Sequence, residues 1–119
     1  MDDGRPIFLQ IAEQIENSII DGTLAEEAQV PSTNELAAFH RINPATAAKG
    51  VNQLVDDGIL YKKRGIGMFV APGAQAKLRQ RRRDQFTEQF LQPLLAEAAK
   101  LGIRPTELKM MIDRHEEIR

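Results

Sequence analysis

The chain has 119 residues, which is room for one ordinary domain or for a small domain with a helical appendage, and this excludes a large catalytic scaffold. Its 42% hydrophobic and 28% charged residues are typical of a soluble, folded protein, and the absence of cysteine excludes disulfide bonds and thiolate metal sites. The net charge is −1, and an acidic start without a long apolar run argues against secretion and membrane insertion, so we expect a cytoplasmic protein.

A first helix is predicted directly behind Pro6. Apolar residues recur there at steps of three and four, which places them on one helical face: Phe8, Ile11, Ala12, Ile15 and Ile19. Gly22 then ends the helix, in the usual order of proline at the start and glycine just past the end.

Residues 23–29 are predicted to form a loop, and a second helix begins at Ser32. Ser32 and Glu35 have the spacing of a capping box, in which each side chain accepts a hydrogen bond from the backbone of the other residue. This helix is short, because Asn43 and Pro44 signal another helix start a few residues later. Its expected apolar face consists of Leu36, Ala37 and Phe39.

The third predicted helix runs from about Pro44 to Asp57 and ends before Gly58. Its inward face has helical spacing and consists of Ala47, Val51, Leu54 and Val55. The opposite face carries small and hydrogen-bonding side chains, namely Ala45, Thr46, Ala48, Lys49, Asn52 and Gln53. Such a face suits close approach to a nucleic-acid groove. A helix face that is exposed to solvent and binds nothing is more often rich in glutamate and lysine.

A β-hairpin is predicted over residues 59–70. Gly65 and Gly67 permit a positive φ in the connection, and β-branched or aromatic residues flank it. Basic residues gather at this connection: Lys62, Lys63 and Arg64. Three helices followed by a hairpin is the order of a winged helix-turn-helix, so the predicted fold is mainly α with a small β-hairpin, followed by a short two-helix tail.

Residues 71–73, Ala-Pro-Gly, predict a boundary between a winged helix-turn-helix over 1–71 and a helical tail over 72–119. Pro93 predicts a kink near residues 90–92, and Gly102 and Pro105 separate the two tail helices. Two helices alone bury too little surface to be stable, so we expect a second copy of the chain to cover them and form a homodimer. The predicted dimer contacts are Phe86, Phe90, Leu91, Leu94, Leu95, Leu101, Leu108, Met111 and Ile112.

The charges are segregated along the chain. Residues 1–39 hold one basic and eight acidic side chains, residues 40–83 hold ten basic and two acidic, and residues 84–119 hold five basic and seven acidic. A strongly basic middle segment is typical of a surface that displaces counterions from phosphate. The arginine run at 79–83 has two open interpretations: a solvated helix start, or a contact with the DNA backbone or the domain linker.

Four motifs in this order resemble the DNA-binding domain of the GntR family: VPSTNELA (30–37), INPAT (42–46), GILY (58–61) and RGIGMFV (64–70). The resemblance covers residues 6–71, and the short tail resembles that of the YtrA subfamily, whose members dimerise through it. The resemblance implies that the third helix enters the major groove of DNA, that the second helix braces it, and that the hairpin tip reaches the minor groove.

The sequence departs from the family pattern at three positions where the wider family often has arginine. Asn34, Pro44 and Ala48 stand there instead, so the base preferences of the family do not transfer to this chain. The DNA contacts that the resemblance implies are Ser32, Thr33, Asn34, Asn43, Ala45, Thr46, Lys49, Lys63, Arg64, Gly65 and Gly67, with Thr46, Arg64, Gly65 and Gly67 as the strongest candidates.

These features predict a sequence-specific DNA-binding transcription regulator, acting as a repressor on an inverted-repeat operator. The alternatives are a winged-helix module for protein or single-stranded nucleic acid, and a ligand-binding protein without DNA affinity. The basic middle segment argues against a purely protein partner and against a ligand-binding protein without DNA affinity. Single strands are disfavoured because Tyr61 and Phe69 are the only aromatic residues of the hairpin and both suit strand packing, which leaves no aromatic platform for base stacking. The tail could also admit a small effector, which no polar cluster identifies. We expect no enzyme activity, cofactor or metal site, because His40 and His115 are too few and too distant and no catalytic arrangement is present.

Overall fold

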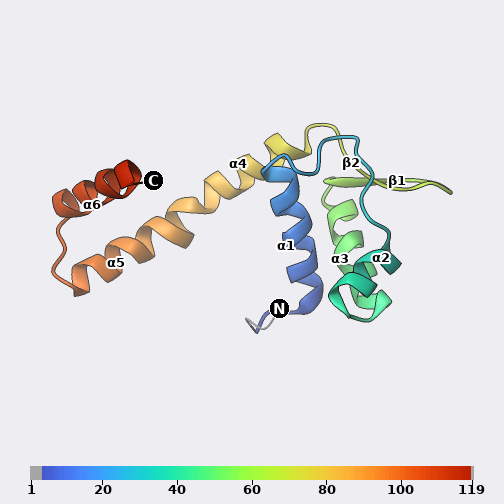
Figure 1. Cartoon of the computed structure of the whole chain (residues 1–119), viewed down its shortest axis with the longest axis horizontal. Coiled ribbons are helices and arrows are strands. Elements are labelled where there is room, and N and C mark those ends of the chain that lie inside the picture. Colours follow the sequence, from blue (N-terminus) through green and yellow to red (C-terminus); the bar gives the residue numbers. More distant parts are fainter. Residues whose placement is uncertain (1–3, 119) are drawn as a thin grey trace. The chain divides into compact units, whose positions relative to one another are not determined.

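The computed structural model describes residues 4–118, with side chains described for residues 4–115. In chain order its elements are α1 (Ile7–Ile20), α2 (Thr33–His40), α3 (Pro44–Asp56), β1 (Leu60–Lys63), β2 (Gly67–Val70), α4 (Ala74–Phe86), a π-helical turn (Thr87–Leu91), α5 (Gln92–Lys100) and α6 (Pro105–Ile118) (Figure 1). The predicted fold, mainly helical with a β-hairpin, is confirmed. The chain divides into two compact units, the first ending at Gln80 and the second beginning at Arg81.

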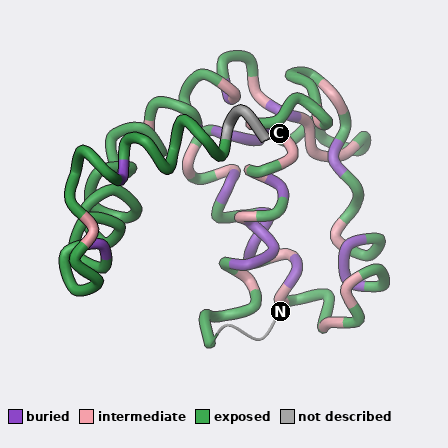
Figure 2. The backbone as a smooth tube through the Cα atoms, turned by 60° about the vertical axis from the view of Figure 1, so that its left-hand side comes forward, coloured by how far each residue is buried: buried purple, intermediate pink, exposed green. Residues whose placement is uncertain are grey.

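The core of the first unit lies between α1, α2 and α3, where Figure 2 shows the buried residues concentrated. α3 packs against both other helices. Gly50 of α3 lets α1 come close, because a Cβ at this position would lie 2.6 Å from the carbonyl oxygen of Phe8. The largest fully buried side chains are Ile11, Ile19, Leu54, Ile59, Leu60, Leu78, Val51 and Val70.

Phe39 does not join this core, so its predicted inward orientation is wrong. Its side chain is 81% exposed, and its ring meets that of His40 edge-on with the centroids 4.9 Å apart. Leu36 and Ala37 are buried as predicted. α2 has eight residues, and its neighbours cover only the middle of such a short helix, which leaves the last turn at the surface.

The hairpin pairs β1 with β2 in antiparallel register, with Leu60 opposite Val70. Residues 27–30, of which 27–29 belong to the predicted loop, run beside β2. The Glu27 N–H donates to the carbonyl oxygen of Val70 (2.8 Å), and the Val30 N–H donates to that of Met68 (2.8 Å). The hairpin is thus supported along one edge and projects beyond the three helices (Figure 1).

The first turns of α4 belong to the first unit. Ala74 and Leu78 are buried in its hydrophobic core. Compact packing therefore continues to Gln80, beyond the division at residue 71 that the Ala-Pro-Gly sequence predicts.

Polar side chains of α4 hold it to the ends of two other helices. The carbonyl oxygen of Ile20, at the end of α1, accepts hydrogen bonds from Gln75 Nε2 (3.1 Å) and Arg79 Nη2 (2.9 Å). Lys77 Nζ donates to the carbonyl oxygen of Asp57, just past α3. Cations are favoured at helix C-termini, where backbone carbonyls lack helical partners. Arg79 therefore fixes the linker helix, which is one of the interpretations left open for the arginine run.

The second unit begins within α4 and continues through the π-helical turn. This turn lies just before Pro93 and overlaps the predicted kink at residues 90–92. Proline has no N–H to donate to the preceding turn. The wider π-helical turn changes the hydrogen-bonding pattern before Pro93, so that the helix continues.

α5 and α6 are separated as predicted. Gly102 has a φ of 73°, which ends α5, and α6 begins at Pro105. Ala98 and Leu108 are the buried residues among those described from position 81 to 115, and nearly all the rest of this unit is exposed (Figure 2). None of the helices that the structure describes has the length and apolar character needed to cross a bilayer.

Candidate nucleic-acid interface

The predicted capping box closes the N-terminus of α2. The Glu35 N–H donates to Ser32 Oγ (3.1 Å), and the Ser32 N–H donates to the Glu35 carboxylate (3.0 Å). The hydrogen bond from the Ser32 backbone lowers the pKa of Glu35, because it favours the ionised carboxylate. Thr33 is half-buried and Asn34 is exposed in this first turn, where backbone N–H groups lack helical partners.

α3 begins behind Asn43, whose Oδ1 accepts a hydrogen bond from the Ala45 N–H (2.7 Å). The cap uses only the Oδ1 oxygen, so the two N–H groups of the Asn43 side-chain amide take no part in it. Ala45 and Lys49 are exposed and Thr46 is half-buried. The Lys49 ammonium lies 4.2 Å from the ring centroid of Phe8, and this cation–π contact holds the lysine beside α1.

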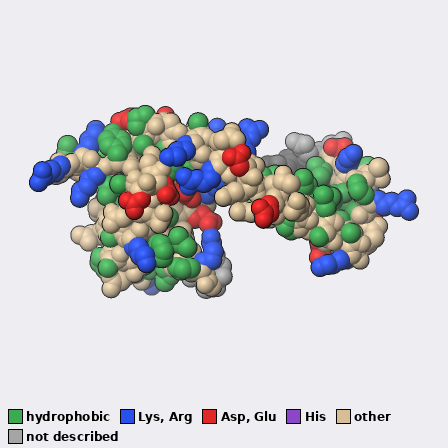
Figure 3. Space-filling model, turned by 180° about the vertical axis from the view of Figure 1, so that it is seen from behind, with side chains coloured by type: hydrophobic (Ala, Val, Ile, Leu, Met, Phe, Trp, Pro, Cys, Tyr) green, Lys and Arg blue, Asp and Glu red, His purple; other side chains and the backbone are tan. Residues whose placement is uncertain are grey.

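The free end of the hairpin is basic. Lys63 and Arg64 are exposed, and Figure 3 shows Lys and Arg side chains gathered where the hairpin projects. Lys63 Nζ lies 4.3 Å from the ring centroid of Phe69. Gly65 and Gly67 have φ values of 76° and 145°, the region in which glycine is favoured, so both are needed to form the turn.

Two residues of the loop before α2 support the hairpin and were missed by the sequence analysis. The Tyr61 hydroxyl donates to the Glu27 carboxylate (2.6 Å), and Gln29 Nε2 donates to the carbonyl oxygen of Ile66 (3.1 Å). The hydrogen bond to Glu27 raises the pKa of Tyr61. These partners are 34 and 37 residues apart in sequence, and no local pattern could have revealed them.

The predicted DNA contacts therefore come together on the first unit. They occupy the first turn of α2, the exposed side of α3 and the hairpin, and α3 packs against both α2 and β1. One further cation in this region, Arg41, was not among the predicted contacts; it is exposed between α2 and α3 and has a φ of 55°. The available signal was its place in the basic middle segment.

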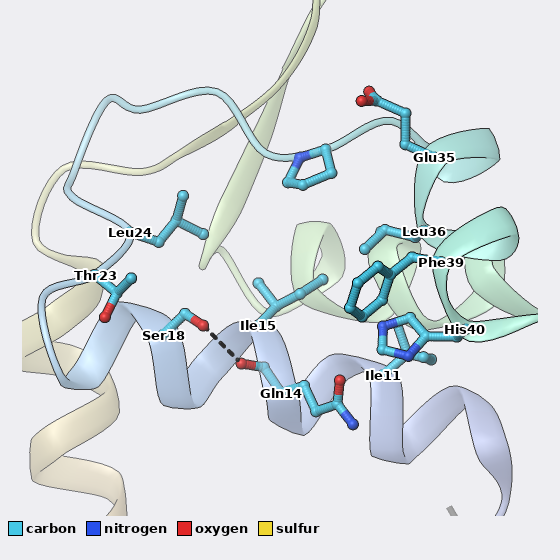
Figure 4. Close-up of a pocket in the computed structure, with 11 residues that line it drawn as sticks. Ile11, Gln14, Ile15, Ser18, Thr23, Leu24, Glu35, Leu36, Phe39 and His40 are labelled. Atoms are coloured by element: carbon cyan, nitrogen blue, oxygen red, sulfur yellow. Dashed lines mark hydrogen bonds between the residues drawn. The ribbon is translucent and has the colours of Figure 1, made fainter.

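A groove of about 510 Å³ lies between α1 and α2, with apolar side chains from both helices and from the loop (Figure 4). Ile11 and Ile15 contribute from α1, and Leu36 and the exposed Phe39 from α2. None of the predicted DNA contacts lines it, so it is separate from that surface. Among the described residues, no group of histidine and carboxylate side chains is arranged to hold a metal ion.

The predicted dimer contacts lie in the second unit, with Phe86 in the part of α4 that belongs to it. Leu108 is 8% exposed and packs within its own chain. The remaining predicted contacts are all exposed: Phe86, Phe90, Leu91, Leu94, Leu95, Leu101, Met111 and Ile112. Hydrophobic side chains are accordingly visible on the surface of this unit in Figure 3.

Comparison with known proteins matches the chain to one family of bacterial regulators. The family described as "Bacterial regulatory proteins, gntR family" matches residues 8–70. The HTH-type transcriptional repressor YtrA of Bacillus subtilis is 29% identical over 103 residues, covering 87% of this chain and 78% of YtrA. This match extends beyond the family region into the tail, which confirms the predicted resemblance to YtrA.

The chain also resembles solved structures. The crystal structure of a GntR-family transcriptional regulator from Bacteroides thetaiotaomicron has a TM-score of 0.74 and 32% identity, covering 93% of this chain and 96% of that one. AraR(DBD) in complex with operator ORX1 has a TM-score of 0.56 and 31% identity, covering 60% of this chain and 86% of that one. The matched proteins are regulators, which confirms the expectation that the chain is not an enzyme. The chain belongs to the GntR family of bacterial regulatory proteins.

Proposed function

We propose that this protein is a cytoplasmic transcription repressor that binds an inverted-repeat DNA operator as a homodimer. One observation carries the proposal: an exposed α3 face of small and hydrogen-bonding residues lies on the same compact unit as a projecting basic hairpin. The resemblance to the repressor YtrA and to AraR(DBD) on its operator supports it.

α3 is the element proposed to enter the major groove. Ala45 and Thr46 are small, so the helix can come close to the base edges, and the Thr46 hydroxyl and methyl groups can contact them. Lys49, held over the Phe8 ring, offers a positive charge to a phosphate. Further phosphate donors are the amide of Asn43 and the first turn of α2, with Ser32, Thr33 and Asn34.

The hairpin is proposed to contact the neighbouring minor groove. Lys63 and Arg64 bring positive charge to it, and the backbone of Gly65 and Gly67 can approach the sugar-phosphate chain without a side chain in the way. The support from Glu27 and Gln29 gives this hairpin a defined position before DNA arrives.

The second unit is proposed to pair two copies of the chain. Exposing this many apolar side chains to water costs free energy. A second copy of the chain that packs against them removes this apolar area from solvent and so stabilises the pair. Such a two-fold dimer presents two α3 helices to half-sites about one helical turn apart. The assignment of DNA binding to residues 1–71 and of dimerisation to 72–119 belongs to this proposal.

The test is fluorescence anisotropy of the full chain with a labelled duplex from upstream of its own gene. We expect specific binding that weakens steeply as KCl is raised, because counterions are released from phosphate. Thr46→Ala and Arg64→Ala should each weaken binding about tenfold, whereas Lys109→Ala, an exposed lysine in the second unit, should not. Binding that is insensitive to salt, or unchanged in both interface variants, would contradict the proposal.

A further inference from the structure

Arg41, between α2 and α3, has a left-handed backbone conformation that residues with a side chain rarely adopt. Its φ and ψ are 55° and 50°. The Arg41 N–H donates to the carbonyl oxygen of Ala38 (3.3 Å), and the Ile42 N–H donates to that of Ala37 (3.0 Å). This pair of hydrogen bonds is the Schellman arrangement that ends a helix, and it favours glycine at the position of Arg41.

Contacts within the fold do not account for an arginine here. The side chain is exposed, whereas the neighbouring Ile42 packs against the core. Within residues 4–115, whose side chains the structure describes, no hydrogen bond, ion pair or ring contact involves the Arg41 guanidinium. The Schellman arrangement explains the left-handed backbone and does not explain why an arginine stands where glycine is favoured, so the reason for this side chain is to be sought outside the chain.

The position of Arg41 supplies such a reason. It lies two residues before Asn43, which caps α3 and keeps its amide N–H donors outside the cap. The N-terminus of α3 adds backbone N–H groups and a partial positive charge. An exposed guanidinium two residues from these donors in sequence is suited to two oxygens of one phosphate.

We propose that Arg41 binds a phosphate of the DNA backbone where α3 enters the major groove. The inference rests on the proposed function, and the contact contributes affinity and register and little sequence preference. The competing role for Arg41 is stabilisation of the C-terminus of α2 by its positive charge. That role predicts an effect on folding and none on DNA binding.

Variants of the full chain separate the two roles. Arg41→Gln removes the charge, Arg41→Lys keeps it, and Arg104→Gln removes an exposed arginine of the second unit as the matched control. Binding to the upstream duplex and to an unrelated duplex is measured by anisotropy over a range of KCl concentrations. We expect Arg41→Gln to weaken both about fivefold and to reduce the slope of log affinity against log salt by about 1. Arg41→Lys should retain the slope, and Arg104→Gln should bind as the unchanged chain does.

Arg41→Gly adds a test in which stability and affinity move apart. Glycine favours the left-handed conformation, so the thermal unfolding midpoint should stay or rise by a few degrees while DNA affinity falls as in Arg41→Gln. If the unchanged chain binds with a steep salt dependence and Arg41→Gln binds equally well, the phosphate contact is wrong and the proposed function stands. If the unchanged chain shows no salt-dependent duplex binding, both are wrong.

Discussion

The two units of the chain carry the same kind of amphipathic helix and differ in what covers its apolar face. In the first unit, Ile11 and Leu54 are 0% and 1% exposed, whereas in the second Phe90 and Leu94, four residues apart, are 61% and 43% exposed. α1, α2 and α3 cover one another within one chain. A helical apolar stripe therefore specifies a face to be covered and does not specify the partner that covers it.

The largest effect is expected from a cavity in the covered core. Leu54→Ala should lower the free energy of unfolding by about 2–5 kcal/mol, because the buried side chain leaves a space its neighbours cannot fill. Urea denaturation, followed by circular dichroism, measures this change in the free energy of unfolding. Ile66→Ala, at an exposed position of the hairpin, is the matched control and should change it by less than about 0.5 kcal/mol. If both variants lost the same free energy of unfolding, burial of the side chain would not explain the effect of Leu54→Ala.

A smaller loss is expected where two helices of the first unit nearly touch. Gly50→Ala should destabilise the chain by about 1–3 kcal/mol, although alanine is the better helix former, because the new Cβ meets the backbone of Phe8. Asn52→Ala, exposed on the same helix, should be neutral or slightly stabilising. Thermal unfolding measures both, and a more stable Gly50→Ala chain would show that α1 and α3 are not so closely packed.

The uncovered stripe of the second unit is tested by placing a charge in it. Leu94→Asp should convert the proposed dimer to a monomer in sedimentation equilibrium and weaken operator binding by about tenfold or more, since only one half-site is then held at a time. Gln89→Asp introduces the same charge at an exposed polar position and should leave the dimer intact. A dimer that survives Leu94→Asp would place the contact elsewhere.

The smallest effect concerns acid stability of the α2 cap. The pKa of Glu35 is lowered by hydrogen bonds from Ser32, so the ionised form is favoured in the folded chain. Its contribution to stability is present above the ordinary value of 4.5 and is lost as the pH falls through the lowered value. Between pH 6 and pH 3, urea denaturation should therefore show a smaller loss of stability in Glu35→Gln than in the unchanged chain. Parallel pH profiles would show that the cap does not depend on this charge.

Local signals predicted the elements of the fold well. Ser32 with Glu35 marks one helix start, and Asn43, which accepts from the Ala45 N–H beside Pro44, marks another, both through hydrogen bonds within three residues. Gly65 and Gly67 mark a turn through their own backbone freedom. Periodicity failed at Phe39, because it assumes that a helix is covered along its whole length.

Contacts between distant segments escaped the sequence analysis. The hydrogen bonds of Gln29 to the hairpin and of Arg79 to the end of α1 join residues 37 and 59 apart, and only the folded chain brings them together. The same holds for the cation–π contact of Lys49 with Phe8. The candidate site was therefore predictable in its location and residue types, and the supports that position its side chains were not.

The central claim is that paired tails present two winged helix-turn-helix units to one duplex. Hydroxyl-radical footprinting of the full chain on its upstream DNA, with the stoichiometry measured on the same duplex, tests it most directly. Two symmetric protected patches about 10 base pairs apart, with two chains bound per duplex, are the expected result. One protected patch with a single chain bound per duplex would contradict the account.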